Sequence, residues 1–259
     1  MRTALTIAGS DSGAGAGIQA DLKTFAAHGV YGTTAITAVT AQNTRGVTAV
    51  HALPPQLVRA QIEAVVTDIG VHAAKTGMLA TAAIVDAVAS AARELNIPFL
   101  IVDPVMRSTS GDLLSDDDVL EAMCVKMLPL AYAVTPNIPE AERLAGMSIA
   151  GDDDRREAAR IIHGFGVNAV IITGGHDRSG PIRDLLYDGS AFTEFRVERV
   201  AGEHTHGTGC TFAAAIAAHL ALGRSLTDAI PLVQRYIAGA IRGAPQLGGG
   251  LGPMDHFFR

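Results

Sequence analysis

One glycine-rich segment of the chain has the residue types and spacing that phosphoryl transfer requires. It reads Gly-Glu-His-Thr-His-Gly-Thr-Gly-Cys over residues 202–210 and runs directly into an apolar helical pattern. Glycines at a helix start let backbone N–H groups approach an anion closely, and the helix dipole adds a favourable field. Enzymes stabilise the transition state of phosphoryl transfer mainly by such positioning and electrostatics. The segment therefore predicts an anion site at Gly207, Thr208 and Gly209, although a glycine-rich helix entry without a ligand has the same signature.

Cys210 follows this segment and falls in the first turn of the predicted helix. We expect the helix dipole to lower the pKa of a thiol there, so that Cys210 accepts a proton or holds a substrate hydroxyl in line. The alternative is a small buried hydrophobic residue, and the adjacent Gly-Thr-Gly favours the chemical role. Cys124 falls in an amphipathic pattern and is predicted to pack in the core. The two cysteines do not indicate a disulfide framework.

A second glycine-rich run covers residues 9–17 and is followed by Asp21. It lacks the usual spacing of a dinucleotide-binding loop, and no Gly-Lys-Ser/Thr follows as in a Walker loop. We expect a turn that encloses a substrate. Asp21 lies one turn into the next helix, and its position alone fits either a pocket residue or a partner of the helix dipole. A nicotinamide-dependent oxidoreductase is a rival hypothesis that rests on this loop, and NAD(H) binding would test it.

The segment Thr-Pro-Asn-Ile-Pro-Glu over residues 135–140 is a candidate metal site. One helical turn would bring Asn137 and Glu140 together, and such an oxygen pair can order water around Mg²⁺. The alternative is a helix N-cap with its capping acid. The acidic runs 116–118 and 152–154 are predicted to stabilise helix N-termini instead of binding metal. The pair His204 and His206 lacks further ligands and does not indicate zinc.

The elements that must position these residues alternate along the chain. Strand-like runs cover residues 4–8, 33–40, 47–53, 72–78, 99–102, 132–135 and 169–173, and a hairpin joins 185–187 to 191–195. Helical patterns cover residues 18–28, 56–67, 81–96 with Thr81 as N-cap, 115–128, 152–165, 209–222 and 225–243. This alternation predicts one α/β domain over residues 1–259, with a mostly parallel sheet covered on both faces. Ligands bind beyond the carboxyl ends of such strands, which selects residues 9–17, 103–111, 135–140 and 173–176.

Composition narrows the possible partners. The 259 residues are 48% hydrophobic, which supports a sizeable core. The net charge is -6 without a basic tract, which argues against nucleic acid or an anionic membrane as partner. The N-terminus enters a strand-like run without a signal-peptide pattern, and no apolar run reaches membrane-spanning length. We therefore expect a cytoplasmic protein.

Taken together, the motifs resemble the bacterial hydroxymethylpyrimidine/phosphomethylpyrimidine kinases of thiamine biosynthesis, members of the ribokinase-like superfamily. The matching segments are 8–11, 15–21, 41–44, 75–79, 103–106, 135–137 with Glu140, 174–176, 206–210, and 250–253 with 256–257. They follow in order from about residue 5 to residue 257. The resemblance implies a ribokinase-like three-layer α/β/α sandwich with a mostly parallel central sheet, and it implies ATP and Mg²⁺ as co-substrate and cofactor.

The resemblance also implies residue roles. Cys210 would act as base, with Gly207, Thr208 and Gly209 around the γ-phosphate. The pyrimidine pocket would be lined by Gly9, Asp21, Gln42, Met78 and Val105, with Gln42 on the amino-pyrimidine edge. Asp103 and Glu140 would face the metal, and the nucleotide would lie against Thr135, Asn137, Thr173 and Gly175. The family often has lysine where this chain has Thr173, so that one phosphate-facing positive charge is missing or is supplied elsewhere.

The implied activity is phosphorylation of 4-amino-5-hydroxymethyl-2-methylpyrimidine and of its monophosphate to the pyrophosphate, by a homodimer. Two alternatives stay open on the same fold. The first is a pyridoxal/pyridoxine kinase, against which Gln42 and Met78 argue as the main activity. The second is a non-catalytic pyrimidine-binding sensor, which Thr173 keeps open and which ATP turnover would discriminate.

Overall fold

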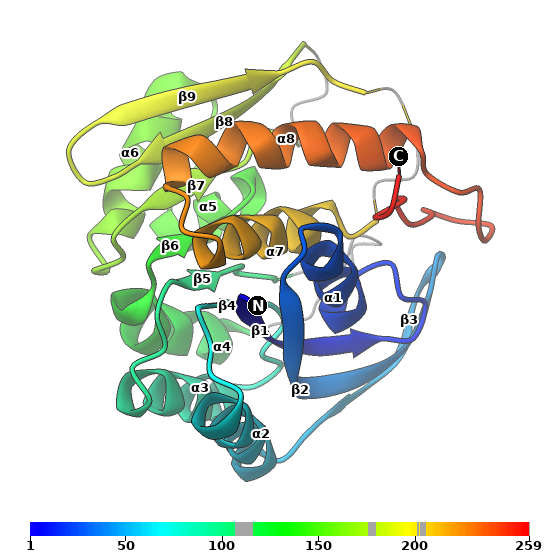
Figure 1. Cartoon of the computed structure of the whole chain (residues 1–259). Helices are drawn as coiled ribbons and strands as arrows, with labels where there is room; N and C mark the ends of the chain where they lie inside the picture. Colours follow the sequence, from blue (N-terminus) through cyan, green and yellow to red (C-terminus); the bar gives the residue numbers. More distant parts are fainter. Residues whose placement is uncertain (107–115, 176–179, 201, 203–205, 259) are drawn as a thin grey trace.

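The computed structural model describes residues 1–106, 116–175, 180–200, 202 and 206–258. His204, His176 and part of the loop 103–111 therefore lie outside the described residues. The described chain forms one strand layer between helices, as Figure 1 shows, and the predicted α/β class is confirmed. The single-domain organisation stays a prediction.

Nine strands of the described chain form one sheet in the order β3-β2-β1-β4-β5-β6-β7-β8-β9. Pairing is parallel from β2 through β7, and antiparallel for β3 at one edge and for β8 and β9 at the other. The predicted mostly parallel sheet and the hairpin are confirmed. The strands are β1 (Thr3–Asp11), β2 (Tyr31–Asn43), β3 (Gly46–Ala52), β4 (Ala73–Thr76), β5 (Leu100–Val102), β6 (Ala133–Val134), β7 (Val170–Ile172), β8 (Ile182–Tyr187) and β9 (Phe192–Val197).

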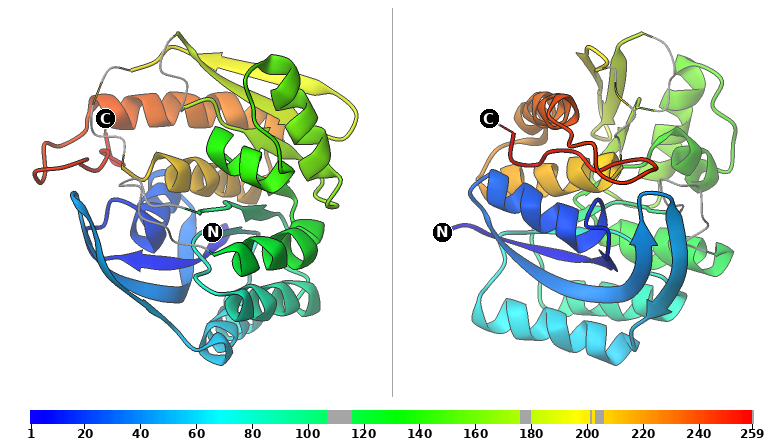
Figure 2. Two further views of the ribbon diagram at one scale, coloured as in Figure 1. Left: turned by 180° about the vertical axis from the view of Figure 1, so that it is seen from behind. Right: turned by 90° about the vertical axis from the view of Figure 1, so that its right-hand side faces the viewer.

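Helices cover both faces of the sheet, as the two views of Figure 2 show. On one face lie α1 (Gly17–Ala27), α7 (Thr208–Ala221) and α8 (Leu226–Arg242), and on the other lie α2 (Pro55–Asp68), α3 (Ala82–Glu94), α4 (Asp117–Ala122), α5 (Ile138–Ala145) and α6 (Asp152–His163). Within β5, Leu100 and Val102 join one core cluster while Ile101 joins the other. A strand buried on both faces must be apolar at every position, which explains the short continuous apolar runs of the sequence.

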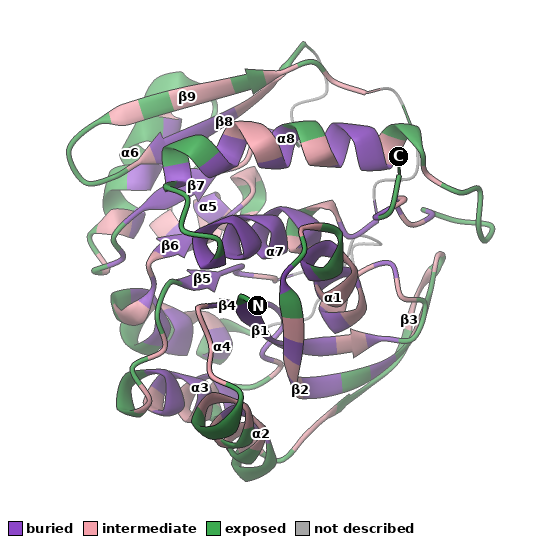
Figure 3. Cartoon of the chain, in the orientation of Figure 1, coloured by how far each residue is buried: buried purple, intermediate pink, exposed green. Residues whose placement is uncertain are grey.

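Helix α7 is the central helix of its layer. Every residue from Thr211 to Ala221 is buried, and Figure 3 shows most of the helix in purple. Small alanines dominate this stretch and allow close approach to the sheet and to α1 and α8. The core therefore fixes the N-terminus of α7, where the predicted anion site lies.

One predicted helix differs from the structure. In place of a single helix over 115–128, α4 ends at Ala122, a π-helical turn follows over Met123–Met127, and a 3-10 turn covers Leu128–Leu130. The π turn shifts the helical register while Met123 and Met127 both stay buried, so that the hydrophobic periodicity continues across the break. Cys124 packs against the core, as predicted, and Thr81 caps α3 by accepting a hydrogen bond from the Ile84 N–H. Among the helices described, none is both long and apolar enough to cross a membrane.

Candidate active site

A cavity of about 670 Å³ opens at the carboxyl ends of the parallel strands, beside the N-terminus of α7. All but one of the predicted site residues line it: Gly9, Gln42, Met78, Asp103, Val105, Thr135, Asn137, Glu140, Thr173, Gly175, Gly207, Thr208, Gly209 and Cys210. Residues from distant parts of the sequence meet here because adjacent parallel strands end at the same edge of the sheet.

The exception is Asp21, whose predicted place in the pocket is wrong. Its side chain is fully buried in α1 and does not line the cavity. Both of its carboxylate oxygens lie 3.0 Å from Lys75 Nζ, and Thr6 Oγ1 donates to Oδ2 at 2.6 Å. A buried carboxylate needs a charged partner, so that Asp21 turns towards Lys75 and away from the cavity.

Lys75 is a buried charged residue next to the cavity to which the sequence alone assigned no role. It is fully buried in β4, and Nζ lies 3.6 Å from Oδ2 of Asp103 at the cavity floor. Burial disfavours the charged ammonium, yet the charges of Asp21, Cys210 and Asp103 outweigh that effect and raise its pKa. The sequence does contain one signal for this site: a lysine lies inside a short strand that is buried on both faces. A charge in such a place must have a charged partner nearby.

Cys210 lies in the first turn of α7, at the cavity wall. Burial raises the pKa of its thiol to about 12, and the opposing effect of Lys75 does not compensate for it because Asp103 and Asp21 also raise the pKa. The expected lowering by the helix dipole is therefore wrong. Burial and the two nearby carboxyl groups determine the direction of the shift, and the thiol is neutral near pH 7.

The two glycine-rich segments pack against each other. Gly207 has a φ of 82°, and a Cβ there would lie 1.9 Å from the backbone oxygen of Gly15. A Cβ on Gly15 would lie 2.2 Å from Cδ2 of His206. These close approaches explain why both positions are glycine, and they connect the loop after β1 to the N-terminus of α7.

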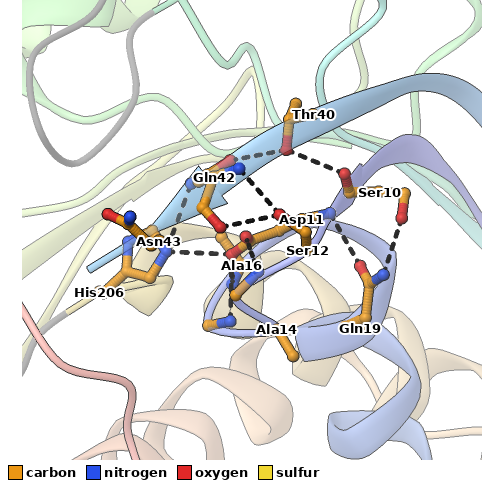
Figure 4. Close-up of polar contacts among 12 residues, drawn as sticks. Ser10, Asp11, Ser12, Ala14, Ala16, Gln19, Thr40, Gln42, Asn43 and His206 are labelled. Atoms are coloured by element: carbon orange, nitrogen blue, oxygen red, sulfur yellow. Dashed lines mark hydrogen bonds and ion pairs between the residues drawn. The ribbon is translucent and has the colours of Figure 1, made fainter. Parts of the chain in front are cut away.

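Asp11 at the end of β1 organises this junction (Figure 4). Its carboxylate accepts hydrogen bonds from the N–H groups of Gly13, Gly15 and Ala16, and Oδ2 lies 3.1 Å from Nε2 of His206. Burial works against its ionisation, but the bonds from His206 and the backbone outweigh burial and lower its pKa. The loop after β1 is thus built around an ionised carboxylate, which the sequence analysis did not single out.

Gln42 reaches the same junction from the end of β2 (Figure 4). Its Oε1 accepts a hydrogen bond from Thr40 Oγ1 at 3.1 Å, and its Nε2 lies 3.5 Å from Nε2 of His206. Met78 packs against Gly9, where a Cβ would lie 2.7 Å from the Met78 methyl carbon. The amide of Gln42 and the apolar side chain of Met78 thus line one end of the cavity together.

Asn137 and Glu140 form the capping box that the sequence analysis held as the alternative. Asn137 Oδ1 accepts from the Glu140 N–H at 3.0 Å, and Glu140 Oε2 accepts from the Asn137 N–H at 2.9 Å. Both residues nevertheless line the cavity together with Asp103. Burial and the neighbouring Asp103 charge raise the pKa of Glu140 to about 8. Burial raises that of Asp103 to about 6, although Lys75 acts in the opposite direction.

These two carboxyl groups fit a divalent cation. Oδ2 of Asp103 is buried and has no hydrogen-bond partner among the described residues. The described part of the chain has no cluster of three or more His, Cys, Asp or Glu side chains of the kind that encloses a metal. Mg²⁺ keeps several waters and is commonly held by one or two carboxylates together with substrate phosphates. The donor set therefore suits Mg²⁺ bound with a nucleotide better than a metal enclosed by protein.

The other end of the cavity is more apolar. Thr135 and Thr173 are held by their backbone N–H groups, which donate to the oxygens of Val102 and Pro136. Beyond them, Val197, Val200, Ile237 and Ile241 line the wall, from the end of β9 and from α8. Apolar side chains there suit a flat aromatic base. No pattern in the sequence pointed to these four residues.

Comparison with known proteins gives a consistent result. The family model described as "Phosphomethylpyrimidine kinase" matches residues 11–255. The "Hydroxymethylpyrimidine/phosphomethylpyrimidine kinase" of Streptomyces coelicolor is 48% identical over 97% of this chain and 93% of its own length. The "Thiamine biosynthesis bifunctional protein ThiED" of Geobacter sulfurreducens is 50% identical over 97% of this chain, which spans 51% of that protein. The Staphylococcus aureus pyridoxal kinase solved with AMP-PCP and pyridoxal superposes with a TM-score of 0.91 at 37% identity, covering 100% of this chain and 94% of that one.

Proposed function

Because the chain belongs to the phosphomethylpyrimidine kinase family and has its ribokinase-like fold, we propose that it transfers the γ-phosphoryl group of ATP to a hydroxymethylpyrimidine. The acceptor is 4-amino-5-hydroxymethyl-2-methylpyrimidine, and a second transfer converts its monophosphate to the pyrophosphate for thiamine biosynthesis. The observation that carries this proposal is that the N-terminus of α7 and the carboxyl groups of Asp103 and Glu140 line one cavity. An anion site and a cation site within one space suit a metal-bound polyphosphate.

The N-terminus of α7 stabilises the transferring group in this proposal. The amides at Gly207, Thr208 and Gly209 point towards developing charge on the phosphoryl oxygens, where preorganised donors contribute most. The transition state of phosphoryl transfer is loose, so that the acceptor hydroxyl needs alignment more than early deprotonation. Cys210, as a neutral thiol, aligns that hydroxyl; as the new P–O bond forms and the bond from the γ-phosphorus to ADP breaks, the hydroxyl proton passes to an oxygen of the transferred phosphoryl group.

Asp103 and Glu140 would hold Mg²⁺, which supplies positive charge to the phosphate oxygens. By holding the cation in place, the two carboxyl groups would orient the phosphates. Lys75, which is buried next to Asp103, offsets the negative charge of Asp103. Burial raises the pKa values of both carboxyl groups, and repulsion by the Asp103 charge raises that of Glu140 further. A bound cation would remove that repulsion.

The cavity divides into two ends in this proposal. Gly9, Gln42, Met78 and Val105 surround the pyrimidine, with the Gln42 amide on its polar edge. Thr135, Asn137, Thr173 and Gly175 border the nucleotide. Both ends meet at Cys210, as transfer between two bound substrates requires.

Pyridoxal is a second candidate acceptor. The support is the close superposition on the S. aureus enzyme solved with pyridoxal. Pyridoxal also carries a hydroxymethyl group on an aromatic nitrogen ring, so that one cavity can align either alcohol. We propose it as a side activity, because the Gln42 amide matches the amino-pyrimidine edge better.

Location and assembly belong to the proposal as well. We propose a cytoplasmic homodimer, supported by family resemblance and by exposed apolar side chains on the β2–β3 edge, Val39 and Val50 among them. Light scattering on the purified protein measures the assembly state directly.

A substrate comparison tests the proposed acceptor. We expect Gln42→Leu to lower kcat/KM for the hydroxymethylpyrimidine roughly 10²-fold while changing that for pyridoxal much less, because a site built for hydrogen bonding penalises lost pairing. The matched control is Gln56→Leu, an exposed glutamine at the start of α2. Equal losses for both acceptors would contradict the assignment of Gln42 to the pyrimidine edge.

A further inference from the structure

The cavity wall just beyond β9 carries a guanidinium group with one unused nitrogen. Arg199 donates from Nη1 to the Gly175 oxygen at 3.1 Å and from Nε to the Gly180 oxygen at 3.3 Å. Its Nη2 is inaccessible to solvent and has no hydrogen-bond partner among the described residues. A buried donor without a partner is costly, and a ligand that accepts from it would remove that cost.

The charge lining the cavity points to the kind of ligand. Among the described residues, the lining includes the carboxyl groups of Asp11, Asp103, Glu140, Asp184 and Glu198, but only two arginines, Arg143 and Arg199. The guanidinium of Arg143 is paired with Asp117 at 2.8 Å. No ion pair to a described residue is found for Arg199. A polyphosphate bound in this largely acidic cavity needs a cation that is not already neutralised, and Arg199 is such a cation.

The position of Arg199 agrees with the nucleotide end of the cavity. Its Nη1 is bound to Gly175, which follows β7 on the same edge as Thr173. Its neighbours Val197 and Val200 belong to the apolar wall suited to a base. A phosphate chain leading from that wall to the N-terminus of α7 would pass this segment.

We propose that Arg199 binds the phosphate chain of the nucleoside triphosphate through Nη2, an inference that rests on the proposed kinase function. Two backbone carbonyls already orient the guanidinium, so that little side-chain freedom is lost when the phosphate binds. Arginine is suited to this task because its planar donor set matches phosphate oxygens. The site thereby obtains a positive charge at its nucleotide end, where Thr173 is neutral.

The test is calorimetric binding of AMP-PCP, ADP and adenosine to the wild-type chain, R199Q, R199K and R196Q. Arg196 is a matched control, since it lies three residues earlier in β9, is 67% exposed and does not line the cavity. We expect R199Q to weaken AMP-PCP and ADP about ten- to a hundred-fold, the usual effect of losing a charged hydrogen bond, with adenosine unchanged. R199K should recover part of the loss, and R196Q should bind as wild type.

Other outcomes separate the possible failures. Equal weakening of adenosine and ADP by R199Q would overturn the proposal, because it would mean that Arg199 shapes the loop or contacts the base. Unchanged ADP and AMP-PCP binding in R199Q would overturn it as well. A third outcome is that the wild-type chain binds AMP-PCP more tightly than R199Q does but phosphorylates neither alcohol. That result would contradict the proposed acceptor and support phosphate binding by Arg199. Wild-type protein without affinity for AMP-PCP would contradict both.

Discussion

Lys75 Nζ lies 3.0 Å from both carboxylate oxygens of Asp21, and neither side chain is exposed to solvent. The pair connects β4 to α1, and Oδ2 of Asp103, a residue that lines the cavity, lies 3.6 Å from Lys75 Nζ. Its partners also hold Lys75 in the charged form at all pH values of interest, because they raise its pKa. Lys75 thus stays positively charged next to Asp103, and the carboxylate of Asp21 balances that charge within the core.

Breaking this pair from one side should destabilise the fold strongly. We expect Lys75→Met to lower the free energy of unfolding by about 3–5 kcal/mol, because it leaves the Asp21 carboxylate buried without its partner. The double variant Lys75→Met, Asp21→Asn should lose clearly less, since it leaves no unpaired charge. Urea unfolding of the two variants measures the difference, and a double variant no more stable than the single one would contradict this account of the pair.

The contact between the two glycine-rich segments predicts a specific sensitivity at Gly15. A methyl group there collides with His206, so that Gly15→Ala should displace the start of α7 and lower kcat/KM at least about tenfold for a shift near 1 Å. Gly151→Ala is the control, because nothing lies within 4 Å of a Cβ at that position. If the two alanine variants are equally active, the packing of Gly15 against His206 does not position the site.

The raised pKa of Glu140 makes stability depend on pH. Its pKa of about 8 in the folded chain lies above the ordinary 4.5, so that the folded state binds this proton more tightly than the unfolded state. The contribution of protonated Glu140 to the free energy of unfolding is therefore fully present below pH 4.5, and it is lost as the pH rises through 8. Glu140→Gln keeps a capping side chain and should be more stable than wild type at pH 9 by at least about 1 kcal/mol, since each unit of pKa shift corresponds to about 1.4 kcal/mol, with no gain near pH 4.

Magnesium should change the stability of the protein through Glu140. Added Mg²⁺ should raise the Tm of the wild-type chain at pH 9, because the cation relieves the repulsion between Glu140 and Asp103, and should raise that of Glu140→Gln less. Differential scanning fluorimetry with and without Mg²⁺ measures both effects. Equal Tm shifts in the two proteins would contradict Glu140 as a metal-facing residue.

The neutral thiol of Cys210 predicts slow chemistry with alkylating agents. With a pKa of about 12, its reaction with iodoacetamide should be slow at pH 7 and still increase with pH above 9. Cys210→Ala should lower kcat about 10²-fold while the KM for the alcohol changes little, since the thiol acts on the reacting hydroxyl. Rapid alkylation at pH 7, or normal turnover of the alanine variant, would show that the thiol has another role.

The strand–loop positions could be predicted from sequence because each apolar strand is followed at once by polar or glycine-rich residues. Asp103, Thr135 and Thr173 follow strands in this way, Gly9 lies near the end of β1, and all four line the cavity. These residues come together because neighbouring parallel strands all end at the same edge of the sheet. The capping box at Asn137 was also foreseen as an alternative, because its spacing is a local property of one helical turn.

What could not be predicted depends on which way a side chain turns after folding. Asp21 lies on a helix that has one face towards the sheet, and only the position of Lys75 on another element decides its partner. The pKa of Cys210 likewise depends on Asp103 and Lys75, which come from other strands. Arg199 follows β9 without any motif, and the orientation of its guanidinium depends on the carbonyls of Gly175 and Gly180.

The most direct test of the proposed function is mass-spectrometric product analysis of the purified chain with Mg-ATP and either the hydroxymethylpyrimidine or pyridoxal. The account predicts both the monophosphate and the pyrophosphate of the pyrimidine, with ADP formed in equal amount to the phosphoryl groups transferred, and at most a slower pyridoxal product. Product from pyridoxal alone, or from neither alcohol, would contradict it.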